Sequence, residues 1–137
     1  MDVSLAVLAD AANVSREGKL NILGAFDTIH ATKFPTTHPS MQLVIRFVAY
    51  PSERLTPRKV TIKLLDADAN ELLTLSGDAV VPDKTGPDDI NMVSIIGFSN
   101  VEFQQAGRYE FSILLNNDVK RTVPLKVVQR EQSQPAT

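Results

Sequence analysis

Apolar side chains recur at every second position along most of this chain, and this spacing is the feature that most constrains its fold. On residues 41–49 the apolar face carries Met41, Leu43, Ile45 and Phe47. Such a period of two is typical of half-buried β-strands, whose side chains alternate between core and solvent. The segments with this pattern are residues 3–11, 19–22, 41–49, 59–65, 108–116 and 119–127.

Turn-forming residues separate these alternating segments. Gly18 follows the first of them, and short polar reversals occupy residues 66–71 and 116–118. Longer Pro-rich connections occupy residues 34–39 and 81–89. Strands joined by loops too short for a crossover helix must run antiparallel. We therefore expect an all-β fold, an antiparallel two-sheet sandwich of immunoglobulin-like type with about seven to nine strands.

Three local features add detail to this prediction. Gly107 precedes Tyr109 by two residues at the start of a late strand, as in the corner packing of immunoglobulin-like sandwiches. Pro124 lies inside the last strand and cannot donate a ladder hydrogen bond, so we expect it at a sheet edge or a bulge. Gly24 is the expected position of a β-bulge that turns the following side chains over and re-aims Asp27.

Length and composition indicate one soluble domain. A chain of 137 residues with 43% hydrophobic and 22% charged residues is ordinary for a single globular domain. We expect the β-sandwich over residues 1–129 and a flexible tail over residues 130–137, which has no apolar face. The absence of cysteine excludes disulfides and thiolate chemistry.

The N-terminal residues and the charge bound the compartment and the partners. Asp2 stands where a secretory signal would carry a basic residue, and Ser4 and Asp10 interrupt the apolar stretch. We therefore expect a cytoplasmic protein. The net charge of −2 is unfavourable for nucleic-acid binding, and no apolar run approaches the roughly 18 residues of a membrane span. We expect neither nucleic acid nor membrane as a partner.

Two loop motifs suggest chemistry but fail on spacing. The Gly18-Lys19 pair lacks the earlier glycine of a phosphate-binding loop, because that position is Asn13, and Leu20 replaces the Ser or Thr that binds magnesium. Asp66 begins an acidic turn that resembles a calcium loop but has the wrong residues at its glycine and glutamate positions. We expect a solvated turn; the alternative is a calcium site shared between loops, with the ligands Asp66, Asp68, Asn70, Asp83, Asp88 and Asp89.

Five polar side chains are the candidates for a ligand site. Asp27, His30 and His38 offer one carboxylate and two ring nitrogens, but their spacing matches no metal motif. Asp10 and Asp27 could perform acid–base chemistry only if both were buried and close together. Arg46 either lies along apolar surface with its charge in water or pairs with one of these carboxylates. We predict no catalytic residue, no metal ligand and no cofactor.

The chain resembles a family of short, uncharacterised bacterial domains. The similarity is carried by an opening Ala-Asp...Ala-Asn run, a Gly-Lys turn and an Asn-Ile-Leu-Gly strand, and it extends over nearly the whole chain to Gln129. This sequence departs from the pattern at Ala11, where an aromatic is usual, and at Ala69-Asn70, where Asp-Gly is usual. The resemblance implies a stand-alone bacterial cytoplasmic domain and implies no activity, cofactor or partner.

Three functions remain open on these observations. The first is a non-enzymatic protein-interaction module that binds a protein partner or a second copy through a free sheet edge, which Pro124 marks. The second is a small-ligand or metal-binding domain, an enzyme included, if the five polar candidates meet in one pocket. A third hypothesis, calcium-dependent membrane association, depends on the acidic loops.

Overall fold

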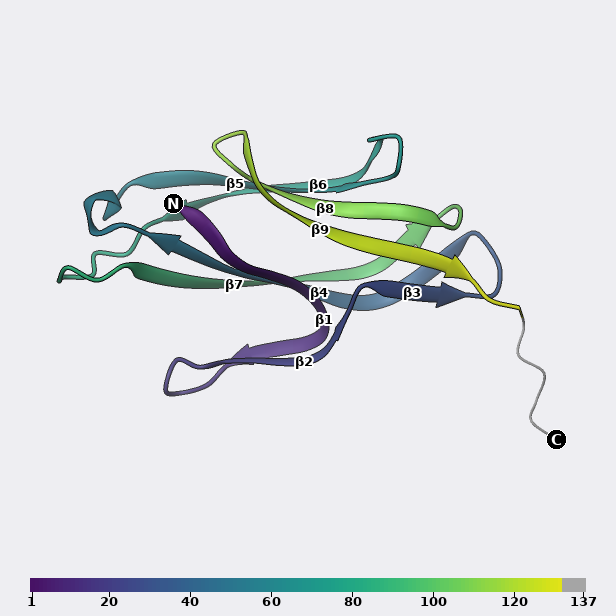
Figure 1. Cartoon of the computed structure of the whole chain (residues 1–137), viewed down its shortest axis with the longest axis horizontal. Coiled ribbons are helices and arrows are strands. Elements are labelled where there is room, and N and C mark those ends of the chain that lie inside the picture. The colour runs from purple at the N-terminus through teal and green to yellow at the C-terminus, as the bar shows by residue number, and fades with distance from the viewer. Residues whose placement is uncertain (132–137) are drawn as a thin grey trace.

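The chain folds into two β-sheets that pack face to face, in a computed structural model that describes residues 1–131 (Figure 1). One sheet has four strands in the order β2-β1-β4-β7, and the other has five in the order β3-β9-β8-β5-β6. The predicted all-β, two-sheet sandwich of seven to nine strands is confirmed. Its strands are β1 (Asp2–Val14), β2 (Leu20–Phe26), β3 (Thr28–Ala31), β4 (Thr36–Ala49), β5 (Pro57–Leu65), β6 (Glu71–Val80), β7 (Ile90–Phe103), β8 (Gly107–Leu115) and β9 (Asp118–Gln129).

Every pair of neighbouring strands is antiparallel except β3 and β9, which run parallel. Thr28 lies opposite Lys126, and Ala31 lies opposite Gln129. The expectation of antiparallel pairing applied to strands joined by short loops, whereas β3 and β9 are far apart in sequence. Most of the predicted tail, residues 130–137, falls outside the described residues; within it, the amide of Arg130 donates to the carbonyl of Ala31 over 2.7 Å.

Most of the core consists of the inward-facing positions that the alternation predicts, and β7, which that pattern does not identify, adds further buried residues. Met41, Leu43 and Ile45 of β4 are fully buried. Phe98 of β7 and Phe111 of β8 meet across the two sheets, with their ring centres 5.2 Å apart. Burying one large apolar side chain contributes roughly 1.5–3 kcal/mol, so this layer supplies most of the free energy that holds the two sheets together.

The predicted corner at Tyr109 is confirmed. Its hydroxyl donates a hydrogen bond of 2.6 Å to the carbonyl of Gln105, in the turn between β7 and β8. Its ring packs edge-on against Phe103. Burial raises the pKa of the Tyr109 phenol. This bond from a strand back to the preceding corner is a hallmark of immunoglobulin-like sandwiches.

Pro124 lies at a sheet edge, as predicted. It faces Glu110 of β8 on one side. On the other side β3 pairs with β9 only from Lys126 onward, so β9 has no outer neighbour at Pro124. A residue without an amide hydrogen is tolerated there because no ladder bond is needed on that side.

The predicted bulge at Gly24 is wrong. The pairing of β1 with β2 keeps one register on both sides of it, with Ala9 opposite Ala25 and Ala11 opposite Leu23. Gly24 instead has a φ of +70°, and a Cβ at this position would collide with the carboxylate of Asp10. The change of side-chain parity occurs at Asp27, where the chain leaves the four-stranded sheet and enters the five-stranded one.

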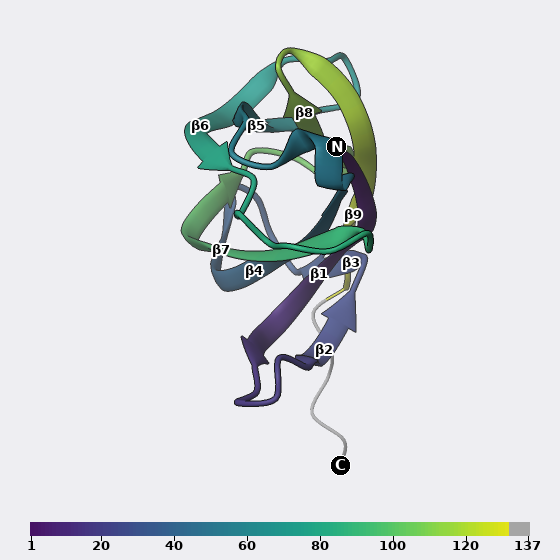
Figure 2. The same ribbon diagram turned by 90° about the vertical axis from the view of Figure 1, so that its left-hand side faces the viewer.

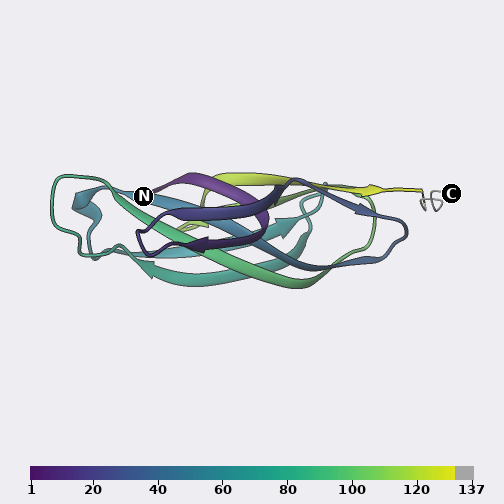
Figure 3. The ribbon, with the colours of Figure 1, turned by 90° about the horizontal axis from the view of Figure 1, so that it is seen from below.

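The acidic loops lie at opposite ends of the molecule. The turn at residues 66–70 closes the β5–β6 hairpin, and the register places Leu65 beside this turn and Pro57 beside the start of the connection 81–89. The length of β5 separates the two loops by about 25–30 Å. The same separation is visible along the long axis of the molecule (Figure 3). A calcium site shared by Asp66 and Asp83 is therefore excluded by the fold.

Candidate functional site

Three of the five polar candidates line one pocket. Asp10, His30 and His38 meet at the place where β2 gives way to β3, in a pocket of about 350 Å³. Phe26, Thr28 and Ile29 complete its lining. These side chains come from β1, β2, β3 and β4, so the pocket depends on the crossing of the chain from one sheet to the other.

His38 is the most constrained side chain of this pocket. Its ring lies against Phe26, with the ring centres 5.8 Å apart. Its Nε2 atom is buried and has no hydrogen-bond partner among the described residues. A buried polar atom without a partner costs free energy and is rare in folded proteins, so it marks a position where a further polar group would be stabilised.

Gly24 makes room for the carboxylate of Asp10. The two residues face each other across β1 and β2, and the side chain of Asp10 occupies the space where any other residue at position 24 would carry its Cβ. The glycine therefore serves to position a carboxylate at the pocket, rather than to form a bulge. The sequence shows a glycine inside a strand, which is an unusual position for glycine, but it does not show that the side chain of Asp10 requires it.

Asp27 and Arg46 lie outside the pocket lining. Asp27 accepts a hydrogen bond from the hydroxyl of its neighbour Thr28 over 2.8 Å, and its side chain is otherwise exposed. Arg46 bonds Ser4 on β1 over 3.2 Å and lies about 26 Å along β4 from His38. Among the described ion pairs none joins Arg46 to Asp10 or Asp27, so the interpretation of Arg46 as their partner is wrong.

Residues 1–131 contain no group of three or more His, Asp or Glu side chains close enough to hold a metal ion. The carboxylate of Asp66 is instead used within its own turn. It accepts hydrogen bonds of 2.9 Å from the amides of Asp68 and Asn70, and the bonds to Asn70 lower the pKa of Asp66. The solvated-turn interpretation of this acidic motif agrees with these contacts.

A second concave surface was not predicted from the sequence. A groove of about 500 Å³ runs between β6 and β7, the two strands that end their sheets on the same side (Figure 2). Its floor is apolar, with Phe47, Val60, Ile62, Met92 and Ile96. The sequence signal was the run Leu72-Leu73-Thr74-Leu75 in β6, which has more apolar residues than one buried face requires.

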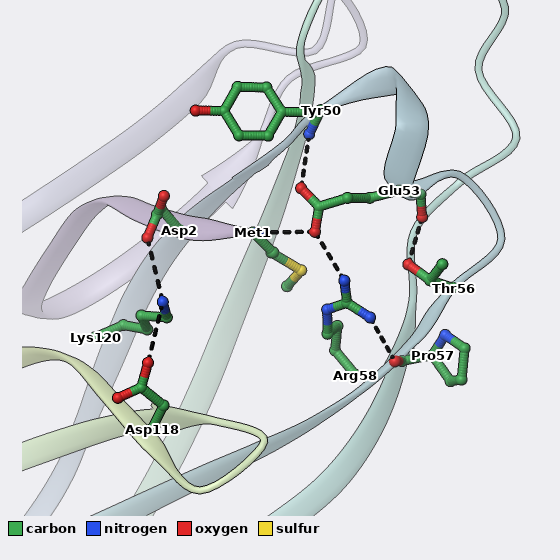
Figure 4. A network of polar contacts seen from close by, with 9 residues as sticks. All are labelled: Met1, Asp2, Tyr50, Glu53, Thr56, Pro57, Arg58, Asp118 and Lys120. Carbon is green, nitrogen blue, oxygen red and sulfur yellow. Dashed lines mark hydrogen bonds and ion pairs between the residues drawn. The ribbon is translucent and has the colours of Figure 1, made fainter.

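A polar network fixes one end of this groove (Figure 4). Glu53 accepts bonds from the amino group of Met1 over 2.7 Å, from the guanidinium of Arg58 over 2.9 Å and from the amide of Tyr50 over 3.0 Å. The amino group of Met1, followed by the amide of Tyr50, lowers the pKa of Glu53 to about 2. The network holds the side chain of Met1 against the groove, which it helps to line.

A second ion-pair group joins the two sheets beside this network. The ammonium of Lys120 lies 3.6 Å from Asp2 on β1 and 3.2 Å from Asp118 on β9 (Figure 4). Asp118 and Asp2 raise the pKa of Lys120. Because these three side chains are partly or largely exposed, the two ion pairs contribute little to stability. Their effect is to favour one position of the start of β1 beside β9.

The fold and the two concave surfaces define the class of protein: a two-layered β-sandwich of immunoglobulin-like type, with a small polar pocket and an apolar groove that is open on one side. The chain belongs to a family of unknown function, DUF6941, whose model matches residues 4–128. No curated protein gives a significant match. No helix within residues 1–131 is long and apolar enough to cross a membrane.

Proposed function

We propose that this domain is a non-enzymatic protein-interaction module that binds an extended segment of a partner protein along the groove between β6 and β7. The observation that carries the proposal is that both groove walls are edge strands. No strand pairing joins β6 to β7, so each has one row of amides and carbonyls without a strand neighbour. Added strands bind such edges through backbone hydrogen bonds, and alternate side chains enter adjoining pockets.

The side chains of the groove support an apolar partner segment. Leu75 of β6 points to the core side of its sheet, opposite Ile62, and is still 44% exposed. Met92 of β7 lies opposite the buried Phe47, so it also points to the core side, and it is half-buried. Covering such side chains with apolar groups contributes roughly 25 cal/mol for each Å² removed from water. Ser94, which lies opposite the buried Ile45 on the same face of β7, provides a polar group that orients the bound segment.

The test compares two substitutions on one strand. Leu75→Glu places a charge in the groove, whereas Leu72→Glu places the same charge on the opposite face of β6, at a residue that is 37% exposed. The tagged domain and both variants capture proteins from an extract of the cells that produce it. We expect the wild-type chain and Leu72→Glu to retain one common partner that Leu75→Glu loses, with all three equally stable on heating.

The proposal fails if Leu75→Glu retains every protein that the wild-type chain captures, or if the wild-type chain captures nothing above a bead control. A photo-crosslinker at position 75 provides an independent measurement, because a groove partner then crosslinks from position 75 and not from position 72.

A second candidate function is the binding of a small polar ligand in the pocket of Asp10, His30 and His38. The buried, unpartnered Nε2 atom of His38 favours it. The measurement is a small-molecule screen that follows the ring signals of the two histidines by NMR. A ligand of this pocket shifts both signals in the wild-type chain and has no effect in His38→Phe; a screen in which no compound moves either signal removes this function.

A further inference from the structure

β2 is one edge of the four-stranded sheet, and most of its residues are exposed. Together with the second half of β1 it forms a hairpin that extends beyond the two packed sheets (Figure 2). Five consecutive residues of β2, from Asn21 to Ala25, are exposed, so both faces of the strand lie in solvent. Leu23 is 72% exposed and Ile22 is 37% exposed. A two-stranded hairpin of this kind is at best marginally stable on its own in water.

This edge has none of the usual protection against pairing. Natural proteins place charges, prolines or very short strands at free edges. β3 has only four residues and β6 carries Glu71 and Asp78, whereas Leu20–Phe26 contains no charged residue and no proline. The nearest charges stand immediately outside the strand, Lys19 before it and Asp27 after it.

The turn of the hairpin determines which residues direct their backbone groups outward. The amide of Ser15 donates to the carbonyl of Lys19 over 2.8 Å, so these two residues form a hydrogen-bonded pair. Such pairs alternate along an antiparallel ladder, so Asn21, Leu23 and Ala25 bond β1. The backbone groups of Leu20, Ile22 and Phe26 therefore point to the free edge.

We propose that two copies of this chain pair through β2 in an antiparallel, two-fold symmetric arrangement centred on Leu23. The residues whose backbone groups point to the free edge are even-numbered. Hydrogen bonds between the two copies therefore form only in registers where an even-numbered residue of one copy lies opposite an even-numbered residue of the other. When the two-fold axis passes through Leu23, Leu20 lies opposite Phe26 of the second copy, and Lys19 lies opposite its Asp27. A centre at Ile22 would instead place Lys19 opposite Ala25 and would bring Asp27 to the turn of the second copy, which carries Glu17, so neither charge would have a partner of opposite sign.

The occupant is a second copy because the edge is complementary to itself in charge. Lys19 and Asp27, which stand immediately outside the neutral strand, form two symmetry-related pairs of opposite charge at its two ends. Pairing joins two four-stranded sheets into one continuous sheet and covers Leu23 against its own copy. This inference uses a different edge from the proposed groove and does not depend on it.

Sedimentation velocity over a series of concentrations tests the pairing. Such a short contact buries less than the roughly 1,200 Å² of stable interfaces, so we expect a dimer that dissociates in the micromolar range. Leu23→Lys, which places two like charges on the symmetry axis, abolishes the dimer. Val14→Lys on β1 of the same hairpin, at a side chain that is 47% exposed, leaves it intact.

Charge exchange tests the register. Lys19→Asp alone and Asp27→Lys alone each weaken the dimer at low salt, and the double variant restores it, because opposite charges then face each other again. A cysteine provides a second readout, since the chain contains none. Leu23→Cys forms a disulfide-linked dimer under mild oxidation, whereas Val14→Cys does not.

A strict monomer at high concentration overturns the inference, as does a dimer that survives Leu23→Lys. A dimer that is lost in Leu75→Glu would place a second copy in the groove and would also overturn it. The two proposals separate cleanly: Leu23→Lys leaves capture of the groove partner unchanged, and Leu75→Glu leaves the dimer unchanged.

Discussion

One alanine of this chain has a backbone conformation that is unfavourable for its residue type. Ala69 adopts a φ of +62° in the turn between β5 and β6, a conformation that costs an alanine roughly 1–2 kcal/mol. The turn is held in place by the carboxylate of Asp66, which bonds the amides of Asp68 and Asn70. The strain is therefore compensated by hydrogen bonds within the same turn.

Ala69→Gly should stabilise the protein by about 0.5–1 kcal/mol, because the relief of strain exceeds the entropy that glycine adds to the unfolded chain. Urea denaturation measures the change. Ala67→Gly is the matched control, since Ala67 has no positive φ, and it should be neutral or slightly destabilising. Equal effects of the two substitutions would contradict the argument.

Tyr109→Phe should destabilise the protein by about 1–2 kcal/mol. The substitution keeps the ring but removes the donor to the carbonyl of Gln105, which then lacks this bond at the corner between β7 and β8. Thermal or chemical denaturation measures the loss. Tyr50→Phe removes a hydroxyl from a side chain that is 59% exposed and should have almost no effect.

At the scale of the element, the β1–β2 hairpin shows how one glycine positions a functional side chain. Two glycines of this hairpin have positive φ, Gly18 at +83° and Gly24 at +70°. Around Gly18 a Cβ would meet no atom within 4 Å, whereas at Gly24 it would collide with the Asp10 carboxylate. Gly18 is therefore required only by its backbone conformation, whereas Gly24 is required both by its backbone conformation and by the space that the Asp10 side chain occupies.

Gly24→Ala should cost more stability than Gly18→Ala. Both substitutions strain the backbone, by about 1 kcal/mol, but only the first also displaces Asp10. We expect a total of about 2–3 kcal/mol at position 24, measured by chemical denaturation. In an Asp10→Gly background, which removes every side-chain atom that the new Cβ would meet, the cost of Gly24→Ala should fall to that of Gly18→Ala; an unchanged cost would show that the two residues do not interact.

At the scale of the whole molecule, the two sides of the sandwich are closed to different degrees. On one side Arg121 of β9 donates to the carbonyl of Val3 on β1 over 3.0 Å, and this contact bridges the two sheets. On the other side β6 and β7 leave the apolar groove open. The Glu53 network lies at one end of that groove and joins the start of β1 to the segment after β4.

The Glu53 network should make stability depend on pH in the acid range. The pKa of Glu53 is about 2 in the folded chain against 4.5 for a free glutamate, so the folded state favours the ionised form. Its contribution is complete above pH 4.5 and is lost as the pH falls toward 2.

The free energy of unfolding of Glu53→Gln should therefore lie about 1–3 kcal/mol below that of the wild-type chain at neutral pH, with the gap closing toward pH 2. A difference in stability that does not change with pH would show that the ionised carboxylate of Glu53 does not stabilise the folded chain.

Part of the candidate site was predictable from the sequence. His30 and His38 flank one loop, and Asp10 shares a hairpin with residues close to that loop, so the chemistry of three pocket residues was visible. Asp27 and Arg46 were wrongly grouped with them as one cluster, because the sequence does not show where the chain changes sheets or which end of β4 lies near the pocket. The groove was missed because the sequence does not show that β6 and β7, although consecutive along the chain, lie in different sheets and do not pair with each other.

The sequence by itself determined six of the nine strands, which are β1, β2, β4, β5, β8 and β9, together with most of the core, because the alternation of side chains and the chemistry of tight turns are local properties. It also determined the Tyr109 corner and the edge position of Pro124. It did not identify β3, β6 and β7, and the first residues of β4 lie in the segment expected to be a Pro-rich connection. Only the tertiary structure decided the parallel pairing of β3 with β9, the role of Gly24, the separation of the acidic loops and the opening between β6 and β7. These features depend on which distant strands become neighbours, and burial of the whole core decides that, rather than any single segment.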